Sequence, residues 1–451
     1  MAEQSATPQF IEDTGLNHAE MNDPVMPVIA GGRMLARGGG ETEAIRRPRR
    51  LGLLATFDGY LLVVTLILVA IGCMMVYSTT FDWGYQDFDN EAHILMLHVR
   101  NLAVAAVPFI ALMLIDYRTW RRFAVLLLLG TIGVLIAVLL FGDDTFNARR
   151  SLFQGSYQPG ELAELVVVIY MAAWLGSKRT RVASIFNGLL PFIALLVLVG
   201  VPIILQPDLS TAATIFVVAG IMYFLAGANI MHLAAVAGLL AAAGWFLSQN
   251  LIYAGNRVGS FIAGLTDVTQ SSDHAQQAII AFMNGGWTGV GLGQGRQKFG
   301  ALPVPHTDSV FAVIGEELGV IGAAFVVLLY VVLLIRGLQV ARRAPDSFGA
   351  LLASGITLWL IVKALLNIAV MLNILPTTGV TLPFVSYGGS SLVTALAGVA
   401  LILSVSRVTA LQNSPEGRNV SAHYDRGWGN RWSRLSGHRH RRRVPQAAPR
   451  R

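Results

Sequence analysis

The stretch GALPVPHTDSVFAVIGEELGVIGAAFVVLLYVVLLIRG, residues 300–337, decides the fold of this chain. A polar turn that ends in His306 and Asp308 leads directly into an apolar run long enough to cross a bilayer as a helix. Glu316 and Glu317 lie about 12 Å further along this helix, at a rise of about 1.5 Å per residue. Carboxylates at such depth usually face a partner or a cavity. The stretch therefore predicts a membrane helix with a polar function inside it.

The composition of the whole chain agrees with a protein made largely of membrane helices. Of its 451 residues, 54% are hydrophobic and 13% are charged, whereas soluble proteins carry about 25% charged residues. Its one cysteine, Cys73, excludes an intrachain disulfide. The net charge of +7 is concentrated in the tails and short loops, so it indicates membrane topology. We expect no nucleic-acid partner.

Apolar runs of about 17 to 25 residues predict an all-α polytopic membrane protein of about ten transmembrane helices. A large extracytoplasmic loop is expected between the seventh and eighth of them. The membrane domain spans residues 55–407, and residues 1–54 and 408–451 are expected to be disordered basic tails. The ten runs are about 58–78, 100–116, 121–141, 161–177, 185–204, 210–227, 230–248, 308–336, 349–372 and 389–406.

Clusters of lysine and arginine predict the orientation of these helices. RRPRR (46–50), YRTWRR (117–122), SKRTR (177–181) and the Arg-rich C-terminal tail all fall on one side of the membrane. Both termini are therefore expected in the cytoplasm.

The opposite, outer face receives three segments rich in proline, glycine and polar residues, at 142–164, 249–308 and 373–391. Irregular backbone at membrane depth is tolerated where it is buried in protein or lines a wet cavity, so we expect the functional site on this face. Positive charge here opposes the topology rule and favours an anionic ligand, because arginine suits phosphate oxygens. The outer cations are Arg149, Arg150, Arg257, Arg296 and Lys298.

Asp308 has two interpretations from the residues alone. It can cap the helix that follows, or it can act as a general base that takes a proton from a hydroxyl. Asp208, in LQPDLST (205–211), presents the same choice, and there the cap is favoured. The glycine-rich stretch 285–298 fits no phosphate-loop pattern. Its glycines predict close approach of the backbone to a ligand or a neighbouring helix.

The charges inside the helices predict an ion pair. Lys363 is the one lysine in the run 349–372 and lies about 15 Å from the outer end of that helix. This depth matches that of Glu316 and Glu317, so we expect Lys363 to pair with one of them. Glu164 is the rival partner, although its position is shallower.

Four stretches of the sequence resemble the SEDS family (shape, elongation, division and sporulation), which includes FtsW, RodA and SpoVE. The similarity spans roughly residues 55–407 and is closer to FtsW and SpoVE than to RodA. The stretches are NARRSLFQGSYQPGELAEL, LQPDLSTA, GGWTGVGLGQGRQKFGALPVPHTDSVFAVIGEELG and LPTTGVTLPFVSYGGSSL.

This resemblance implies a peptidoglycan glycosyltransferase that polymerises lipid II at the outer face of the bacterial cytoplasmic membrane. The essential aspartate of the family falls on Asp308, and two of its arginines fall on Arg150 and Arg257. Its partners would be a class B penicillin-binding transpeptidase and proteins of the divisome or elongasome. The arginines, or a divalent cation such as Mg²⁺ or Mn²⁺, would stabilise the leaving group; the metal is unknown. We also assign substrate binding to Gln297, Lys298, His306 and Ser386.

The chain departs from the family at Glu164, where a lysine is usual, and at Lys363, where an uncharged polar residue is usual. The two departures fit an exchange of ion-pair partners. Glu164 also keeps two alternatives open: a flippase for lipid-linked precursors that uses the same cavity without chemistry, and a non-catalytic scaffold for division proteins.

Overall fold

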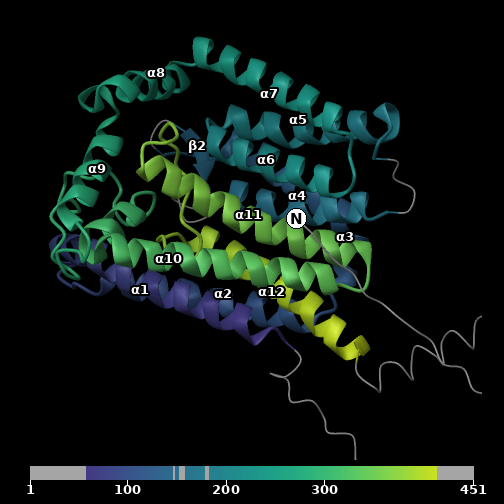
Figure 1. Cartoon of the computed structure of the whole chain (residues 1–451), viewed down its shortest axis with the longest axis horizontal. Helices are drawn as coiled ribbons and strands as arrows, with labels where there is room; N and C mark the ends of the chain where they lie inside the picture. Colours follow the sequence, from purple (N-terminus) through teal and green to yellow (C-terminus); the bar gives the residue numbers. More distant parts are fainter. Residues whose placement is uncertain (1–56, 146–147, 152–157, 178–181, 414–451) are drawn as a thin grey trace, which may run out of the picture. The chain divides into compact units, whose positions relative to one another are not determined.

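The structure, a computed structural model, describes residues 57–145, 148–151, 158–177 and 182–413. Within these residues, ten helices occupy the ten predicted apolar ranges (Figure 1). They are α1 (Gly59–Phe88), α2 (His93–Leu114), α3 (Arg118–Phe141), α4 (Pro159–Leu175), α5 (Leu190–Leu205), α6 (Leu209–Leu225), α7 (Ile230–Asn250), α10 (Val310–Arg343), α11 (Ser347–Met371) and α12 (Gly389–Asn413). The predicted tails lie outside the described residues, except for residues 408–413, which continue α12.

The chain is a multi-pass membrane protein. In the part that the structure describes, eight helices are long and apolar enough to cross a membrane, counting α5 together with the π-helical turn Ile185–Leu189 before it. The remaining two, α4 and α6, have 17 residues each, which is the lower limit for a span. The predicted all-α class is confirmed, whereas the number of spans stays a prediction.

The outer segments contain more regular structure than the sequence indicates. The predicted loop 249–307 holds α8 (Ile252–Thr266), a 3₁₀ turn (Val268–Gln270) and α9 (Asp273–Gly285). Their apolar stretches are too short to be recognised as spans, and Ser272 caps α9 by accepting from the N–H of Ala275 at 3.4 Å. A short hairpin, β1 (Asp143–Thr145) and β2 (Ala148–Ser151), is the one departure from all-α structure among the described residues.

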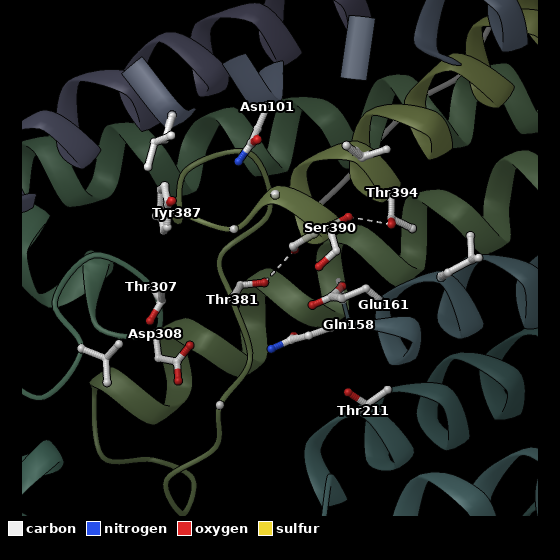
Figure 2. Close-up of a pocket in the computed structure, with 18 of the residues that line it drawn as sticks. Asn101, Gln158, Glu161, Thr211, Thr307, Asp308, Thr381, Tyr387, Ser390 and Thr394 are labelled. Atoms are coloured by element: carbon white, nitrogen blue, oxygen red, sulfur yellow. Dashed lines mark hydrogen bonds between the residues drawn. The ribbon is translucent and has the colours of Figure 1, made fainter. Parts of the chain in front are cut away.

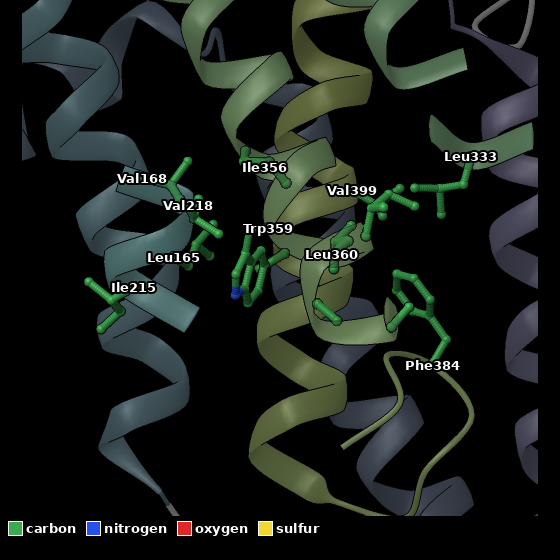
Figure 3. Packing of buried hydrophobic residues seen from close by; sticks show 14 of the residues in the cluster. Leu165, Val168, Ile215, Val218, Leu333, Ile356, Trp359, Leu360, Phe384 and Val399 are labelled. Carbon is green, nitrogen blue, oxygen red and sulfur yellow. The ribbon is translucent and has the colours of Figure 1, made fainter. Parts of the chain in front are cut away.

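Four helices form the centre of the membrane domain. α11 packs against α4, α6 and α12, and α4 also packs against α6 and α12. Trp359 of α11 is 1% exposed and lies among aliphatic side chains of α4 and α6 (Figure 3). α7 is the least enclosed of the candidate spans, and it contacts mainly α8. This packing places the first turns of α4, α6 and α12 and the last turn of α11 close together.

Helix α10 is interrupted at Gly319, and the glycine-rich stretch 285–298 forms hydrogen bonds with the backbone groups on either side of the interruption. Gly319 has φ 68° and ψ −170° inside the helix, a conformation that glycine adopts without strain. The freed backbone groups bond across to the stretch: the N–H of Val290 donates to Glu316 O, and the N–H of Val320 donates to Gly286 O, both at 3.0 Å. A side chain at Gly289 would collide with the carbonyl of Glu317. The predicted close approach to a neighbouring helix is thus present.

Candidate functional site

A cavity of about 930 Å³ opens where several helix ends and connecting segments meet. Its walls come from α2, the first turns of α4, α6 and α12, the turn before α10, and the 373–388 connection (Figure 2). Three carboxylates line it, Glu161, Asp208 and Asp308, and Arg100 is the one lysine or arginine among the described residues that line it. The cavity can therefore receive a ligand that has both hydroxyl and anionic groups.

Asp308 lies in the wall of this cavity and does not cap α10. The cap position belongs to Ser309, whose hydroxyl donates instead to Pro303 O. Burial raises the pKa of Asp308 to about 6, although Thr307 and Arg257 lower it, and Glu161 and Asp208 add to the increase. A carboxylate with this pKa is ionised at neutral pH and holds a proton more readily than an ordinary aspartate, as a general base requires.

Asn367 and Ser386 fix the turn that carries Asp308. The amide of Asn367 donates to Asp308 O at 2.7 Å and to Val380 O at 2.8 Å, so it ties the turn to the 373–388 connection. The hydroxyl of Ser386 donates to Thr307 O at 2.6 Å. Ser386 is 5% exposed, does not line the cavity and holds the backbone beside Asp308, so its assignment to substrate binding stays a prediction.

Asp208 is a helix cap, as the sequence favours. It accepts from the N–H of Thr211 at 3.1 Å and from the Thr211 hydroxyl at 2.7 Å at the start of α6. It also lines the cavity, where its charge raises the pKa of Asp308.

Lys363 does not pair with Glu316 or Glu317, so that prediction is wrong. Its ammonium group forms an ion pair with Glu161 and lies 3.0 Å from Glu164. The indole of Trp359 also donates to Glu164, at 2.8 Å. Glu161 and Glu164 are three residues apart, so they lie on one face of α4 and turn toward α11. The exchange of ion-pair partners inferred from the two family departures agrees with this contact.

Glu317 has a different cation, Lys298, whose Nζ lies 2.6 Å away and also donates to Ser78 at 3.0 Å. Lys298 is 6% exposed, does not line the cavity and is already neutralised by Glu317, so its assignment to substrate stays a prediction. Glu316 accepts from the backbone N–H of Arg296 and Gln297 at 3.1 and 3.2 Å. Both glutamates therefore anchor the glycine-rich stretch to α10.

His306, Arg257 and Gln297, which the sequence also assigns to binding, are not among the residues that line the cavity. The ring of His306 lies between those of Trp83 and Tyr387, with centroids 5.2 and 5.8 Å away. Arg257, on α8, is near enough to lower the pKa values of Asp308 and His274. Gln297 has its side-chain oxygen buried without a partner among the described residues. For Arg150 the structure describes the backbone, in β2, and its side chain lies outside the described part.

Across the described ranges, no group of three or more His, Cys, Asp or Glu side chains is arranged to hold a metal ion. Of the three carboxylates in the cavity wall, Glu161 pairs with Lys363, Asp208 caps α6, and Asp308 is the candidate base. The divalent cation stays a prediction, with no ligand group assigned to it.

Sequence reasoning missed Arg100, Asn101, Glu161 and Asn367. Arg100 stands in an apolar run, which is itself a signal of function in a membrane helix. Asn367 follows Lys363 by one helical turn, so the two share a face of α11. Glu161 was visible in the same motif as Glu164, but its direction toward α11 depends on packing.

Comparison with known proteins places these residues in a family. The family model described as "Cell cycle protein", for FtsW, RodA and SpoVE, matches residues 59–411. The chain is 36% identical to stage V sporulation protein E of Bacillus subtilis, over 78% of this chain and 97% of that protein. It is also 36% identical to a probable peptidoglycan glycosyltransferase FtsW of Geobacter sulfurreducens, over 80% of this chain and 97% of that protein.

Solved structures share the fold. The crystal structure of the rod shape determining protein RodA of Thermus thermophilus is 26% identical with a TM-score of 0.59, and the match covers 78% of this chain and 97% of that one. A chain from a structure described as "Structural coordination of polymerization and crosslinking by a peptidoglycan synthase complex" is 27% identical with a TM-score of 0.64. That match covers 78% of this chain and 98% of that one.

Proposed function

Because this chain belongs to the SEDS family of FtsW, RodA and SpoVE, we propose that it is a peptidoglycan glycosyltransferase that polymerises lipid II. Lipid II is a disaccharide-pentapeptide on undecaprenyl pyrophosphate, so it combines an apolar tail, an anionic linker and sugar hydroxyls. A cavity at the outer ends of membrane helices can receive all three. The observation that carries the proposal is Asp308, a carboxylate in the cavity wall with its pKa raised to about 6.

The reaction needs one base and a good leaving group. Asp308 removes the proton from the 4-hydroxyl of the acceptor N-acetylglucosamine, and that oxygen attacks C1 of the donor N-acetylmuramic acid. The bond between C1 and the pyrophosphate oxygen breaks, and undecaprenyl pyrophosphate leaves with the electron pair. Inversion at C1 gives the β-1,4 link. The second carboxylate that glycoside hydrolases use to protonate an alkoxide is not required, because pyrophosphate leaves as a stable anion.

The turn carrying Asp308 is held before substrate arrives. Asn367 and Ser386 hold its backbone through two hydrogen bonds of 2.7 and 2.6 Å, and a third bond ties Asn367 to Val380 O at 2.8 Å. Fixed placement of a reacting group reduces the entropy lost on reaching the transition state. These buried hydrogen bonds thus hold Asp308, the proposed base, in place.

The proposed membrane is the bacterial cytoplasmic membrane, with both termini inside and the cavity outside. Gln270, an exposed residue of the segment between α7 and α10, tests this orientation when changed to cysteine in a Cys73→Ser background. We expect an impermeant thiol reagent to label it in intact cells and to leave a cysteine at position 10 unlabelled. Labelling at position 10 with protection of position 270 would reverse the orientation.

The proposed partner is a class B penicillin-binding transpeptidase, which crosslinks the strands that this chain makes, within the divisome or the elongasome. Support comes from the relative whose structure is described as a complex that coordinates polymerization and crosslinking.

Purified protein with labelled lipid II tests the proposed function directly. We expect glycan strands of many disaccharides, with addition of the transpeptidase increasing their yield or crosslinking. A flippase would move lipid II across a vesicle membrane without forming polymer, and a scaffold would do neither. Absence of polymer both with and without the transpeptidase would refute the proposal.

A further inference from the structure

The charges that line the cavity include one cation without an ion-pair partner among the described residues. Lys298 is neutralised by Glu317, and Lys363 by Glu161 and Glu164. Arg100 of α2 lines the cavity and has no hydrogen-bond or ion-pair partner among the described residues. An arginine within a candidate membrane span normally faces a partner or a functional site. Arg100 is thus available for a ligand.

Two polar side chains without partners stand beside Arg100. Asn101 follows it on α2, and Ser390 lies in the first turn of α12; neither side chain has a hydrogen-bond partner within the described ranges. α2 and α12 pack together, and the Asn101 amide nitrogen lies 3.0 Å from where a Cβ on Gly389 would stand. The three side chains therefore belong to one wall, built where α2 meets the start of α12.

Asn101 and Asp308 lie in different parts of the cavity. Figure 2 shows Asn101 in the upper part, Asp308 in the lower part, and Ser390 between them, above Glu161. Burial raises the pKa of Tyr387, which also lines the cavity, and the charge of Arg100 lowers it, so Arg100 acts on this upper part. An anion is repelled by Asp308, Asp208 and Glu161 and attracted by Arg100, so it would bind in the upper part.

The depth of Arg100 indicates the kind of anion. It lies seven residues into α2, or about 10 Å at about 1.5 Å per residue. A phosphate that carries a lipid tail lies at the boundary of the membrane while its tail stays in the bilayer, so it can approach an arginine at this depth. The planar guanidinium matches two phosphate oxygens at once, and the amide of Asn101 and the hydroxyl of Ser390 add neutral donors.

We propose that Arg100, Asn101 and Ser390 bind the pyrophosphate of the polyprenyl-linked substrate. The inference rests on the proposed function and adds Arg100 to the cations that the sequence offers for an anionic ligand. It also gives the leaving group a cation on the wall away from Asp308, so that the base and the departing pyrophosphate do not compete for one position.

Equilibrium binding to the purified full chain in detergent tests this inference without requiring catalysis. The probes are undecaprenyl pyrophosphate, undecaprenyl phosphate and undecaprenol, with inorganic pyrophosphate as a competitor that has no tail. We expect the wild-type chain to bind the pyrophosphate lipid most tightly and the alcohol most weakly. Arg100→Gln should weaken binding of the pyrophosphate lipid by about 10- to 100-fold and leave binding of undecaprenol unchanged.

Arg122→Gln is the matched control, because Arg122 is an exposed arginine at the start of α3, outside the cavity lining. Arg100→Lys should retain part of the affinity, and Ser390→Ala, which removes one small hydroxyl, should weaken binding less than Arg100→Gln does. Strong competition by inorganic pyrophosphate would indicate a site for the free anion instead of the lipid. Equal affinity of Arg100→Gln and wild type for the pyrophosphate lipid would overturn the inference. The proposed function would still stand if wild type then polymerised lipid II and Asp308→Asn did not.

Discussion

Replacing Asp308 with asparagine is expected to reduce lipid II polymerisation by about 10²- to 10⁴-fold, the usual contribution of a general base. The amide keeps the size of the carboxylate but cannot accept the proton. Folding should be preserved, because Asp308 caps no helix and its turn is held through backbone oxygens by Asn367 and Ser386. The measurement is the initial rate of glycan formation, together with the thermal midpoint of the purified variant.

Asp267→Asn is the control for this substitution. Asp267 is an exposed aspartate that caps the 3₁₀ turn between α8 and α9, and it does not line the cavity. Its variant should polymerise at close to the wild-type rate. A near wild-type rate for Asp308→Asn would leave Asp308 a structural residue and would remove the base from the mechanism.

Replacing Lys363 with methionine should be the most destabilising single substitution of those considered. Lys363 is 3% exposed, and its ammonium group faces Glu161 and Glu164. Its removal leaves two carboxylates close together without a cation, and breaking a buried pair costs roughly 3–5 kcal/mol. Thermal unfolding in detergent should show a midpoint many degrees below that of wild type, with less folded protein in membranes.

Double variants identify the partner of Lys363. Lys363→Met combined with Glu164→Gln should regain part of the lost stability, and adding Glu161→Gln should regain more, because replacing all partners by neutral groups removes the unpaired charges. Lys363→Met combined with Glu317→Gln should be worse than either change alone, since Glu317 belongs to Lys298. Coupling of Lys363 to Glu317 but not to Glu161 or Glu164 would contradict the contacts described here.

Hydrophobic runs predicted where the ten helices lie, because each run must be apolar over a whole span. They did not predict the ends: α1 continues to Phe88, since residues 79–88 remain helical after the apolar run stops. Nor did they indicate α8 and α9, whose alternation of polar and apolar residues suits an interface rather than a span. The polar and glycine-rich composition of the outer segments located the cavity, and the motif resemblance located Asp308.

The ion-pair partners of the buried charges could not be predicted from the sequence. Depth along a helix follows from residue number and predicted that Glu317 and Lys363 pair. The direction of a side chain around the helix axis, however, depends on the neighbouring helices. α10 turns Glu317 toward Lys298 and Ser78, whereas α11 turns Lys363 toward α4. The role of Asn367 could not be predicted for the same reason, because it depends on two backbone oxygens that separate loops bring near its side chain.

The pH dependence of lipid II polymerisation tests the central claim, that Asp308 is the base, most directly. The base must be ionised to accept a proton, so the rate should fall about tenfold per pH unit below the pKa of Asp308 and level off above it. An ordinary aspartate would place this acid limb near pH 4, whereas burial raises the pKa of Asp308 to about 6. We predict an acid limb centred near pH 6 in wild type and lost in the residual activity of Asp308→Asn. A rate unchanged between pH 5 and 8, or the same limb in both proteins, would contradict the account.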